Sequence, residues 1–448
     1  MNRARARRGH LTMRERGSDV DVTDTIAAAA AELRDELTAL LAEGVRIPSV
    51  NPARGAGSAG EGAFQEFIAR HLDRLGARVD VWEPDGEELA ARFPQTLTGS
   101  TRDFRGRPNV VGVFGDAAPG DLHLILNSHA DTVAADLARW RHDPFAAAIE
   151  DGWLYGLGAA DAKGCLLAFL GALRVLRHAG VRLARSVALE SVVDEEAGGG
   201  GALGCIARGY RASGALVGEP TSLAVCPGSR GAFGLTLAVS GRSAHLGVAY
   251  DGVNAIDLAL RYIQAFHALG RELDGVYVHP LWQPLPRGHV FTVTDIATAP
   301  SPGAVPSHCR VRFSVGYMAG ETYAETLARV EEAFARVTAD DPWLAAHPPV
   351  IQAAEPFIEA AAAPADHPLV AALTGTAAGA GLAAPRVEAL SAGTDGRFLT
   401  NLGGTPAVNV GPGEMARAHG PDEAIRLDEF HRAVVWFALA IARYCGVG

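Results

Sequence analysis

The chain has 448 residues, a hydrophobic share of 48% and a formal net charge of −11 at pH 7. This length favours two domains, each with enough apolar residues for a core of its own. The acidic balance excludes a nucleic-acid partner, because residues 1–20 contain the only basic stretch, and no apolar run approaches the roughly 20 residues of a membrane helix.

Residues 1–22 are expected to form a disordered tail. The stretch is rich in arginine, but no hydrophobic segment and no cleavage site follow it, so it does not resemble a secretory signal. The five cysteines are widely spaced without a C-x-x-C pair, which fits neither a disulfide framework nor a zinc finger. We expect them to be buried thiols in a reducing cytoplasm.

Residues 23–227 are predicted to form the first part of an α/β domain. Helical and strand patterns alternate through this range, which is typical of a largely parallel sheet with helices on its faces. The predicted helices are 24–45, 61–77, 164–180 and 201–212, and the predicted strands are 109–115, 121–133, 185–196 and 214–221.

A different pattern from residue 228 predicts an inserted module. Residues 228–357 contain alternating strands and two long amphipathic helices, in the order strand–helix–strand–strand–helix–strand. That order predicts a small α+β sandwich with its helices on one face. Residues 358–448 return to helix, strand and helix, and we expect them to complete the first domain.

Histidine and acidic residues gather where predicted strands end, the edge at which open α/β sheets place ligand sites. His129 and Asp131 follow the strand "LHLILN", and as positions i and i+2 of an extended segment they face the same way. Asp131 is therefore suited to hold the second ring nitrogen of a metal-bound His129. The plain alternative is a hydrogen-bonded loop.

Further positions share this placement. Asp161 lies in a glycine-rich turn before a helix, where a helix N-cap is the alternative. Glu195 and Glu196 follow a strand, where a solvated acidic loop is the alternative. Glu219 ends an apolar strand, and His419 lies in a loop rich in glycine and proline.

A common role explains these residues better than separate ones. Two histidines and three carboxylates supply the nitrogen and oxygen ligands that a pair of zinc-like ions requires. The cations would offset the repulsion between the adjacent acids of "SVVDEEAGGGG". One glutamate would then bind metal while its neighbour, as general base, takes the proton of the attacking water.

The same glycines allow a different interpretation. Gly199, Gly201 and Gly204 fit the G-x-G-x-x-G spacing of a dinucleotide site, with Glu219 about twenty residues further on. Three acidic residues would then lie beside a pyrophosphate, which is electrostatically unfavourable. A dinucleotide-dependent oxidoreductase is therefore a distant alternative, and so is a non-catalytic binding protein, because no catalytic residue is lost.

Seven motifs follow one another in the chain: "SHADTV", "GLGAADAKG", "DEEAGGGGA", "VGEPT", "GRSAHLGVAYDGVNAI", "GTDGRF" and "GPGEMARAHGPDE". In this order they resemble the di-zinc amidohydrolases and peptidases of the acetylornithine deacetylase, succinyl-diaminopimelate desuccinylase and aminoacylase group. The resemblance implies a zinc-peptidase-like catalytic domain with a mostly parallel central sheet. It also implies that a ferredoxin-like lid or dimerisation domain interrupts the catalytic domain.

The resemblance implies two divalent ions, zinc or alternatively cobalt, held by His129, Asp161, Glu196, Glu219 and His419. Asp161 bridges the ions, His129 and Glu219 complete one, and Glu196 and His419 complete the other. In the same scheme Glu195 is the general base, and Asp131 orients His129.

The inserted module carries a further residue of this scheme. His245 resembles the histidine that reaches across a homodimer to stabilise the tetrahedral oxyanion. The module would accordingly be the lid and dimerisation domain of the family. Thr394 and Arg397 of "SAGTDGRF" are expected to line the substrate pocket, with a plain glycine-rich loop as the alternative.

The segment that includes "VPSHC" departs from the family pattern. The family often has an arginine there that binds the substrate's carboxylate, whereas this chain has Gly316 at the matching position. Ser314 and Ala319 stand where the family has aspartate and proline, and Arg310 and Arg312 lie nearby. The metal ligands are therefore complete while the carboxylate clamp is altered.

The residues and this resemblance together lead us to expect a cytoplasmic, homodimeric di-zinc hydrolase. The expected reaction is cleavage of the amide bond of an N-acyl amino acid or N-acyl amine. Dipeptide or carboxypeptidase-type hydrolysis and deformylation of a carboxylate-free amine are alternatives with the same centre.

Overall fold

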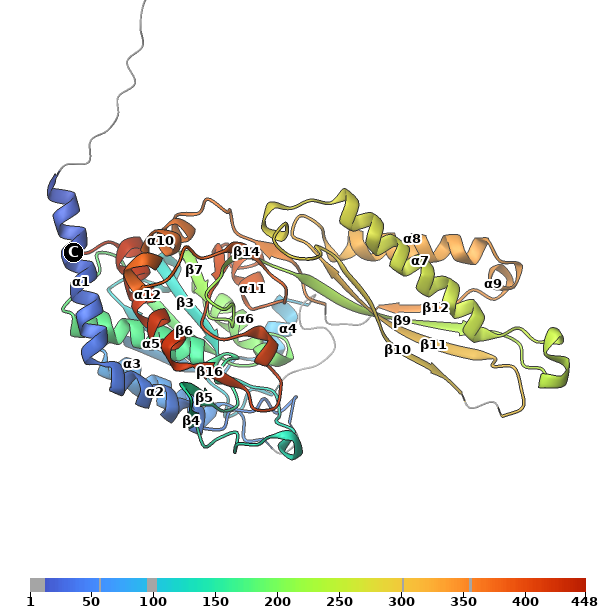
Figure 1. The fold of residues 1–448 in the computed structure, drawn as a ribbon, viewed down its shortest axis with the longest axis horizontal. Helices are drawn as coiled ribbons and strands as arrows, with labels where there is room; N and C mark the ends of the chain where they lie inside the picture. The colour runs from blue at the N-terminus through green and yellow to red at the C-terminus, as the bar shows by residue number, and fades with distance from the viewer. Residues whose placement is uncertain (1–12, 56–57, 95–102, 300–301, 354–356) are drawn as a thin grey trace, which may run out of the picture.

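The computed structural model describes residues 13–55, 58–94, 103–299, 302–353 and 357–448 (Figure 1). The first twelve residues of the expected tail lie outside this part of the chain. Residues 13–22, which were also expected to belong to the tail, are helical in α1 (Met13–Glu32). Figure 1 shows a larger domain built around a central sheet and a smaller, elongated domain that extends from it.

The larger domain contains a nine-stranded mixed sheet. Strands β6, β3, β7 and β15 form its parallel centre, and antiparallel pairs flank this centre on both sides. The expected α/β fold is confirmed, with antiparallel outer strands added to the predicted parallel sheet. In spatial order the strands are β1 (Arg78–Trp82), β2 (Asn109–Phe114), β6 (Val187–Val192), β3 (Leu122–His129), β7 (Ala212–Val217), β15 (Ala407–Asn409), β8 (Val225–Ser229) and β13 (Ala361–Ala362), with β14 (Val387–Leu390) also paired to β8.

Helices cover both faces of this sheet because its central strands are apolar on both sides. Leu124 and Leu126 of β3 pack into one core, and Ile125 between them packs into the other. The first core is covered by α1, α2 (Arg34–Arg46), α3 (Gly62–Arg74), α5 (Lys163–His178), α10 (Pro368–Thr376) and α12 (Leu427–Cys445). The second is covered by α4 (Gly86–Arg92), α6 (Gly200–Ala207) and α11 (Gly396–Asn401).

A small sheet that the sequence did not indicate lies beside the carboxyl ends of the central strands. It joins β16 (Ala424–Arg426), β5 (Trp153–Tyr155) and β4 (Ala148–Glu150) in antiparallel order. These strands are three residues long, too short for alternation to be read from the sequence. They connect the loop before α5 with the loop before α12.

The inserted domain has the predicted strand and helix order. Its antiparallel sheet has the spatial order β10-β11-β9-β12, and α7 and α8 cover one face (Figure 1). Alternate residues of β9, such as Leu235 and Leu237, point into the core beneath these helices, while the opposite face is open. The elements are β9 (Gly231–Ser240), α7 (Ala255–Val276), β10 (Val290–Thr298), β11 (His308–Tyr317), α8 (Tyr323–Ala339), α9 (Pro342–Ala346) and β12 (Val350–Ala353).

Two expectations from composition can be compared with the fold. All five cysteines are buried and free, as predicted. Within the described residues, no helix has the length and apolar character needed to cross a bilayer.

The buried side chain of His431 in α12 makes the stability of the fold depend on pH. Its Nε2 lies 3.0 Å from the Thr38 hydroxyl oxygen, and burial, followed by the charge of Arg34, lowers its pKa to about 4. A lowered pKa means that the unfolded chain binds the proton more readily between pH 6.5 and 4, so falling pH destabilises the folded state there. We expect wild type to lose about 2 kcal/mol more stability than His431→Gln between pH 7 and pH 5.

Urea unfolding at the two pH values measures this difference. His308→Gln, which changes an exposed histidine of β11, is the matched control and should follow wild type. Equal pH slopes for wild type and His431→Gln would contradict the assignment.

Candidate metal centre

The predicted site residues meet at the carboxyl ends of adjacent parallel strands. His129 is the last residue of β3, Glu195 and Glu196 follow β6 in a 3₁₀ turn (Glu195–Ala197), and Glu219 follows β7. Because these three strands are neighbours in the order β6-β3-β7, their ends lie side by side.

Asp161 lies between two histidines. Its Oδ1 atom is 3.1 Å from Nε2 of His129, and its Oδ2 atom is 3.3 Å from Nε2 of His419. The imidazole of His419 also approaches Glu196, with Nε2 2.9 Å from Oε1. Each oxygen of one carboxylate therefore faces a different imidazole, which is the arrangement of a bridging ligand between two cations.

The charge states of these groups point to the same arrangement. Burial alone lowers the pKa of His129, but its hydrogen bond to Asp161 and the charges of Asp161 and Glu219 outweigh burial and raise that pKa well above its usual value. Hydrogen bonds to Asp161 and Glu196 raise the pKa of His419 to about 10. The surrounding acids thus favour positive charge at both imidazoles, and metal ions at these nitrogens would supply it.

The donor set fits a pair of divalent ions. Ligand atoms of His129, Asp161 and Glu196 lie within 4.8 Å of one another, and all three side chains are largely buried. Nδ1 of His129 donates a hydrogen bond to the carbonyl oxygen of Asp131 over 2.9 Å, which leaves Nε2 for a ligand. His419 has a side chain 52% exposed, so this side of the centre is open to solvent.

Asp131 contacts both His129, as expected, and the acidic turn that follows β6. Its carboxylate Oδ1 lies 3.6 Å from Nδ1 of His129, whereas its two oxygens accept the backbone N–H groups of Glu195 and Glu196, both over 3.1 Å. Asn51 donates a third hydrogen bond over 2.8 Å. The carboxylate thus holds the turn that presents the two glutamates, and the backbone carbonyl of Asp131 orients His129.

Asp194 explains how three acids can be adjacent. Its backbone is left-handed (φ 70°), and its Oδ1 accepts a hydrogen bond from Arg107 over 3.2 Å. Arg107 in turn forms a buried bidentate ion pair with Glu61, over 2.6 and 2.7 Å. Asp194 therefore points away from its neighbours into a cation. Sequence reasoning missed this pair, because nothing local links Glu61 to Arg107.

Glu195 lies close to two charged residues of the "GTDGRF" motif, Asp395 and Arg397. Burial, followed by the charge of Asp395, raises the pKa of Glu195 to about 8. Nη1 of Arg397 lies 4.0 Å from Oε1 of Glu195. Thr394 points elsewhere, donating from its hydroxyl to Asn409 over 2.7 Å. Of the two predicted pocket residues, only Arg397 is thus seen to contact the predicted catalytic acid.

Two further acids surround the centre. Glu219 is 5% exposed, and its negative charge contributes to the raised pKa of His129. Glu423, beside the small sheet, accepts the backbone N–H groups of Ala160 and Asp161 over 2.9 and 3.0 Å. Glu423 was not predicted, and it fixes the turn that carries Asp161.

Close packing explains the glycine run. A Cβ atom on Gly199 would lie 2.1 Å from Phe398, and one on Gly201 would lie 2.3 Å from the carbonyl oxygen of Val193. Gly199 also has a φ of +77°, a conformation that L side chains rarely adopt. These glycines let α6 and α11 approach the acidic turn, which argues against a phosphate-binding loop.

His245 belongs to the segment between β9 and α7 of the inserted domain. It precedes the 3₁₀ turn Leu246–Asp251, and its Nδ1 accepts the N–H of Gly247. In Figure 1 this yellow-green segment between β9 and α7 lies at the end of the inserted domain that is far from the central sheet.

Gly316 of β11 occupies the position at which the family often has a carboxylate-binding arginine. Arg310 and Arg312 lie on the exposed face of β11, and Arg310 approaches Asp295 over 3.5 Å. Arg230, at the junction of the two domains, instead fills the space above Gly316, where a Cβ would lie 2.9 Å from its Cδ. The buried guanidinium of Arg230 donates from Nη2 to the carbonyl oxygen of Arg287 over 2.8 Å.

Residues 125–443 match peptidase family M20/M25/M40. The chain belongs to this family. It is 26% identical over 386 residues to N-formyl-4-amino-5-aminomethyl-2-methylpyrimidine deformylase of Bacillus subtilis, covering 82% of this chain and 85% of that protein. It is 27% identical over 383 residues to acetylornithine deacetylase of Proteus mirabilis, covering 85% and 89%.

Among solved structures, the fold is similar to an M20 family metallo-carboxypeptidase of Sulfolobus solfataricus. The TM-score is 0.67 at 17% identity, and the match covers 91% of this chain and 99% of that one. This M20 chain is accordingly a hydrolase of amide or peptide bonds from a metal-dependent family. The membership argues against the dinucleotide-dependent alternative.

The role of Asp131 can be tested through metal binding. Asp131→Asn replaces one acceptor oxygen by a donor, so at least one N–H of the Glu195–Glu196 turn loses its partner. We expect zinc affinity, measured by competition with a chelator, to fall roughly 10- to 100-fold. Asp85→Asn is the matched control, because Asp85 also accepts two successive backbone N–H groups but at the start of α4. Unchanged zinc affinity in Asp131→Asn would refute the assigned role.

Proposed function

We propose that this chain hydrolyses the amide bond of a small N-acylated amine, using two divalent metal ions. The observation that carries the proposal is Asp161, whose two carboxylate oxygens each face Nε2 of a different histidine. A carboxylate of this kind is suited to bridge two cations, and zinc is the ion that best matches a mixed set of imidazole and carboxylate ligands, with cobalt as an alternative.

Five residues would hold the ions. Asp161 would be shared by both, His129 and Glu219 would hold one, and Glu196 and His419 would hold the other. The 2.9 Å approach of His419 to Glu196 supports this second pair. The pairing of Glu219 with His129 rests on its burial and on the effect of its charge on the His129 pKa.

The bound ions would polarise the amide carbonyl and make a water molecule more acidic. Glu195 takes the proton of the attacking water and delivers it to the leaving amine, as a general base and then a general acid. Its position beside the ligand Glu196, with Arg397 4.0 Å away, supports this role. Asp131 keeps both glutamates in place through their backbone N–H groups.

We propose a homodimer in which His245 of one chain completes the centre of the other and stabilises the oxyanion. His245 is exposed, and the segment between β9 and α7 that carries it lies far from the central sheet of its own chain. Leu246 and Tyr250 beside it are 57% and 82% exposed, which is the kind of apolar surface that a second subunit would cover. Residues 228–357 would act as the lid and dimerisation domain, and residues 23–227 and 358–448 as the two parts of the catalytic domain.

The preferred substrate is an N-acyl amine without an α-carboxylate, such as an N-formyl amine. Arg310 and Arg312 lie on the open face of the inserted sheet, and Arg230 is buried above Gly316 with its guanidinium bonded to a backbone carbonyl. The similarity to the Bacillus subtilis deformylase points to the same substrate class. N-acyl amino acids are the second candidate, because Arg397 is a cation close to Glu195 and the deacetylase of Proteus mirabilis is also similar.

The proposed reaction takes place in the cytoplasm. The five free, buried thiols are suited to a reducing compartment.

A paired substrate panel tests the substrate class. Each N-formyl or N-acetyl amino acid is compared with its carboxylate-free analogue, and release of the amine by the zinc- or cobalt-loaded enzyme is measured. We expect a kcat/KM at least about tenfold higher for the carboxylate-free member, because the guanidinium beside Gly316, that of Arg230, is buried and bonded to a backbone carbonyl. If the enzyme instead prefers the carboxylates, and Arg397→Met abolishes this preference, then Arg397 is the residue that binds the substrate's carboxylate.

Glu195→Gln tests the proton carrier. The substitution keeps the size of the side chain but removes the base, so we expect kcat to fall at least about 10³-fold while two metal ions per chain remain bound. Glu88→Gln, at an exposed position in α4, serves as the control. Turnover near the wild-type value in Glu195→Gln would exclude Glu195 as the base, and loss of one metal would make it a ligand instead.

A further inference from the structure

A groove on the side of the catalytic domain opposite to the metal centre carries a separate site. Two adjoining cavities, of about 450 and 860 Å³, form this groove and share Leu75 and Arg177. Their sizes fall within the range of small-molecule pockets. The groove lies between α3, the C-terminal part of α5 and the segment before β6, and β6 itself separates it from the acidic turn by roughly 20 Å.

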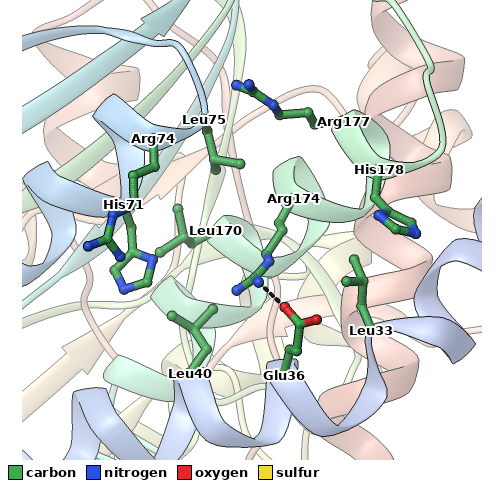
Figure 2. A pocket seen from close by; sticks show the side chains of 10 residues that line it. All are labelled: Leu33, Glu36, Leu40, His71, Arg74, Leu75, Leu170, Arg174, Arg177 and His178. Atoms are coloured by element: carbon green, nitrogen blue, oxygen red, sulfur yellow. Dashed lines mark hydrogen bonds and ion pairs between the residues drawn. The ribbon is translucent and has the colours of Figure 1, made fainter.

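The first cavity has basic walls and an apolar floor. Figure 2 shows Arg74 and His71 from α3 on one side, and Arg174, Arg177 and His178 from α5 on the other. Leu40, Leu75 and Leu170 lie between these walls. The second cavity continues this chemistry with Leu173, Leu176, Val181, Leu183 and Phe114 beside Arg177, Arg182 and Arg185.

Much of this positive charge has no internal partner. Glu36 pairs with Arg174, and Glu32 pairs with His178. Among the described residues, no carboxylate lies within 4 Å of Arg74, Arg177 or Arg182. The chain as a whole has a net charge of −11, whereas these three guanidiniums make the surroundings of the groove positive.

Helix ends account for only part of this pattern. Arg74 lies in the last turn of α3 and Arg177 in the last turn of α5, where cations are favoured. The five lining arginines nevertheless outnumber the two lining carboxylates, Glu36 and Asp116. The pKa of His71 is lowered first by burial and then by Arg74, which is consistent with a positive potential in the groove.

We propose that this groove binds an organic phosphate, with its phosphate group at Arg177, which lines both cavities, and its apolar body along Leu75, Leu173 and Leu176. Guanidinium groups bind phosphate through paired hydrogen bonds, and a dianion can accept from two of them at once. The leucine floor supplies the apolar contact that an inorganic anion cannot use. The site is independent of the proposed reaction, because none of its residues belongs to the metal centre.

Calorimetric titration of the metal-loaded enzyme tests the proposal with hexyl phosphate, hexanoate and inorganic phosphate. We expect hexyl phosphate to bind at least about tenfold more tightly than either of the others. Arg177→Gln, which changes the arginine common to both cavities, should weaken hexyl phosphate binding at least about tenfold and leave amide hydrolysis unchanged. Arg271→Gln is the matched control, because Arg271 is an exposed arginine of α7 without a carboxylate partner in the described chain.

A second variant separates the two parts of the ligand. Leu75→Ser should remove most of the advantage of hexyl phosphate over inorganic phosphate, with the melting temperature recorded to confirm folding. Hexyl phosphate affinity that Arg177→Gln leaves unchanged would place binding elsewhere, at the metal centre for example, and overturn the proposal. Equal affinity for hexanoate and hexyl phosphate would also overturn it, since a phosphate group would then have no role.

Discussion

The structure depends on how it accommodates like charges at the ends of three parallel strands. Buried carboxylates repel one another and lose hydration, so each needs a cation or a set of hydrogen-bond donors. The chain meets this need differently for each acid: Asp161 lies between two imidazoles, Asp194 turns to Arg107, and Asp131 accepts two backbone N–H groups. Two metal ions at the Asp161 carboxylate would replace the positive charge that protons on the two imidazoles supply.

The scaffold makes this concentration of charge possible. Adjacent parallel strands end at the same edge of the sheet, and short turns after each strand carry the polar residues. The turn after β6 is shaped by the left-handed backbone of Asp194 and by Gly199, where any side chain would collide with Phe398. The site is therefore built on rigid elements, and the glycines serve close approach of backbone and ring.

The inserted domain places its arginines where they bear on the proposed choice of substrate. Its sheet has one face covered by α7 and α8 and one open face, so arginines on the open strand positions of β11 face solvent. Loss of a side chain at Gly316 makes room for Arg230, which binds a backbone carbonyl of its own domain boundary. The basic groove on the far side of the catalytic domain is a separate polar surface, and α5 extends from the turn of Asp161 to this groove.

The sequence by itself determined the α/β pattern, the order of elements in the inserted module and the residues His129, Asp161, Glu196 and His419 that converge. Hydrophobic periodicity and strand-end position are local properties, so they can be read from neighbouring residues. Only the tertiary structure decided the partners that join distant segments, such as Glu61 with Arg107 or Arg230 with Gly316, because no local pattern links such positions. The hydrogen bonds of the Asp131 carboxylate also join distant segments, because their donors belong to a turn more than sixty residues away.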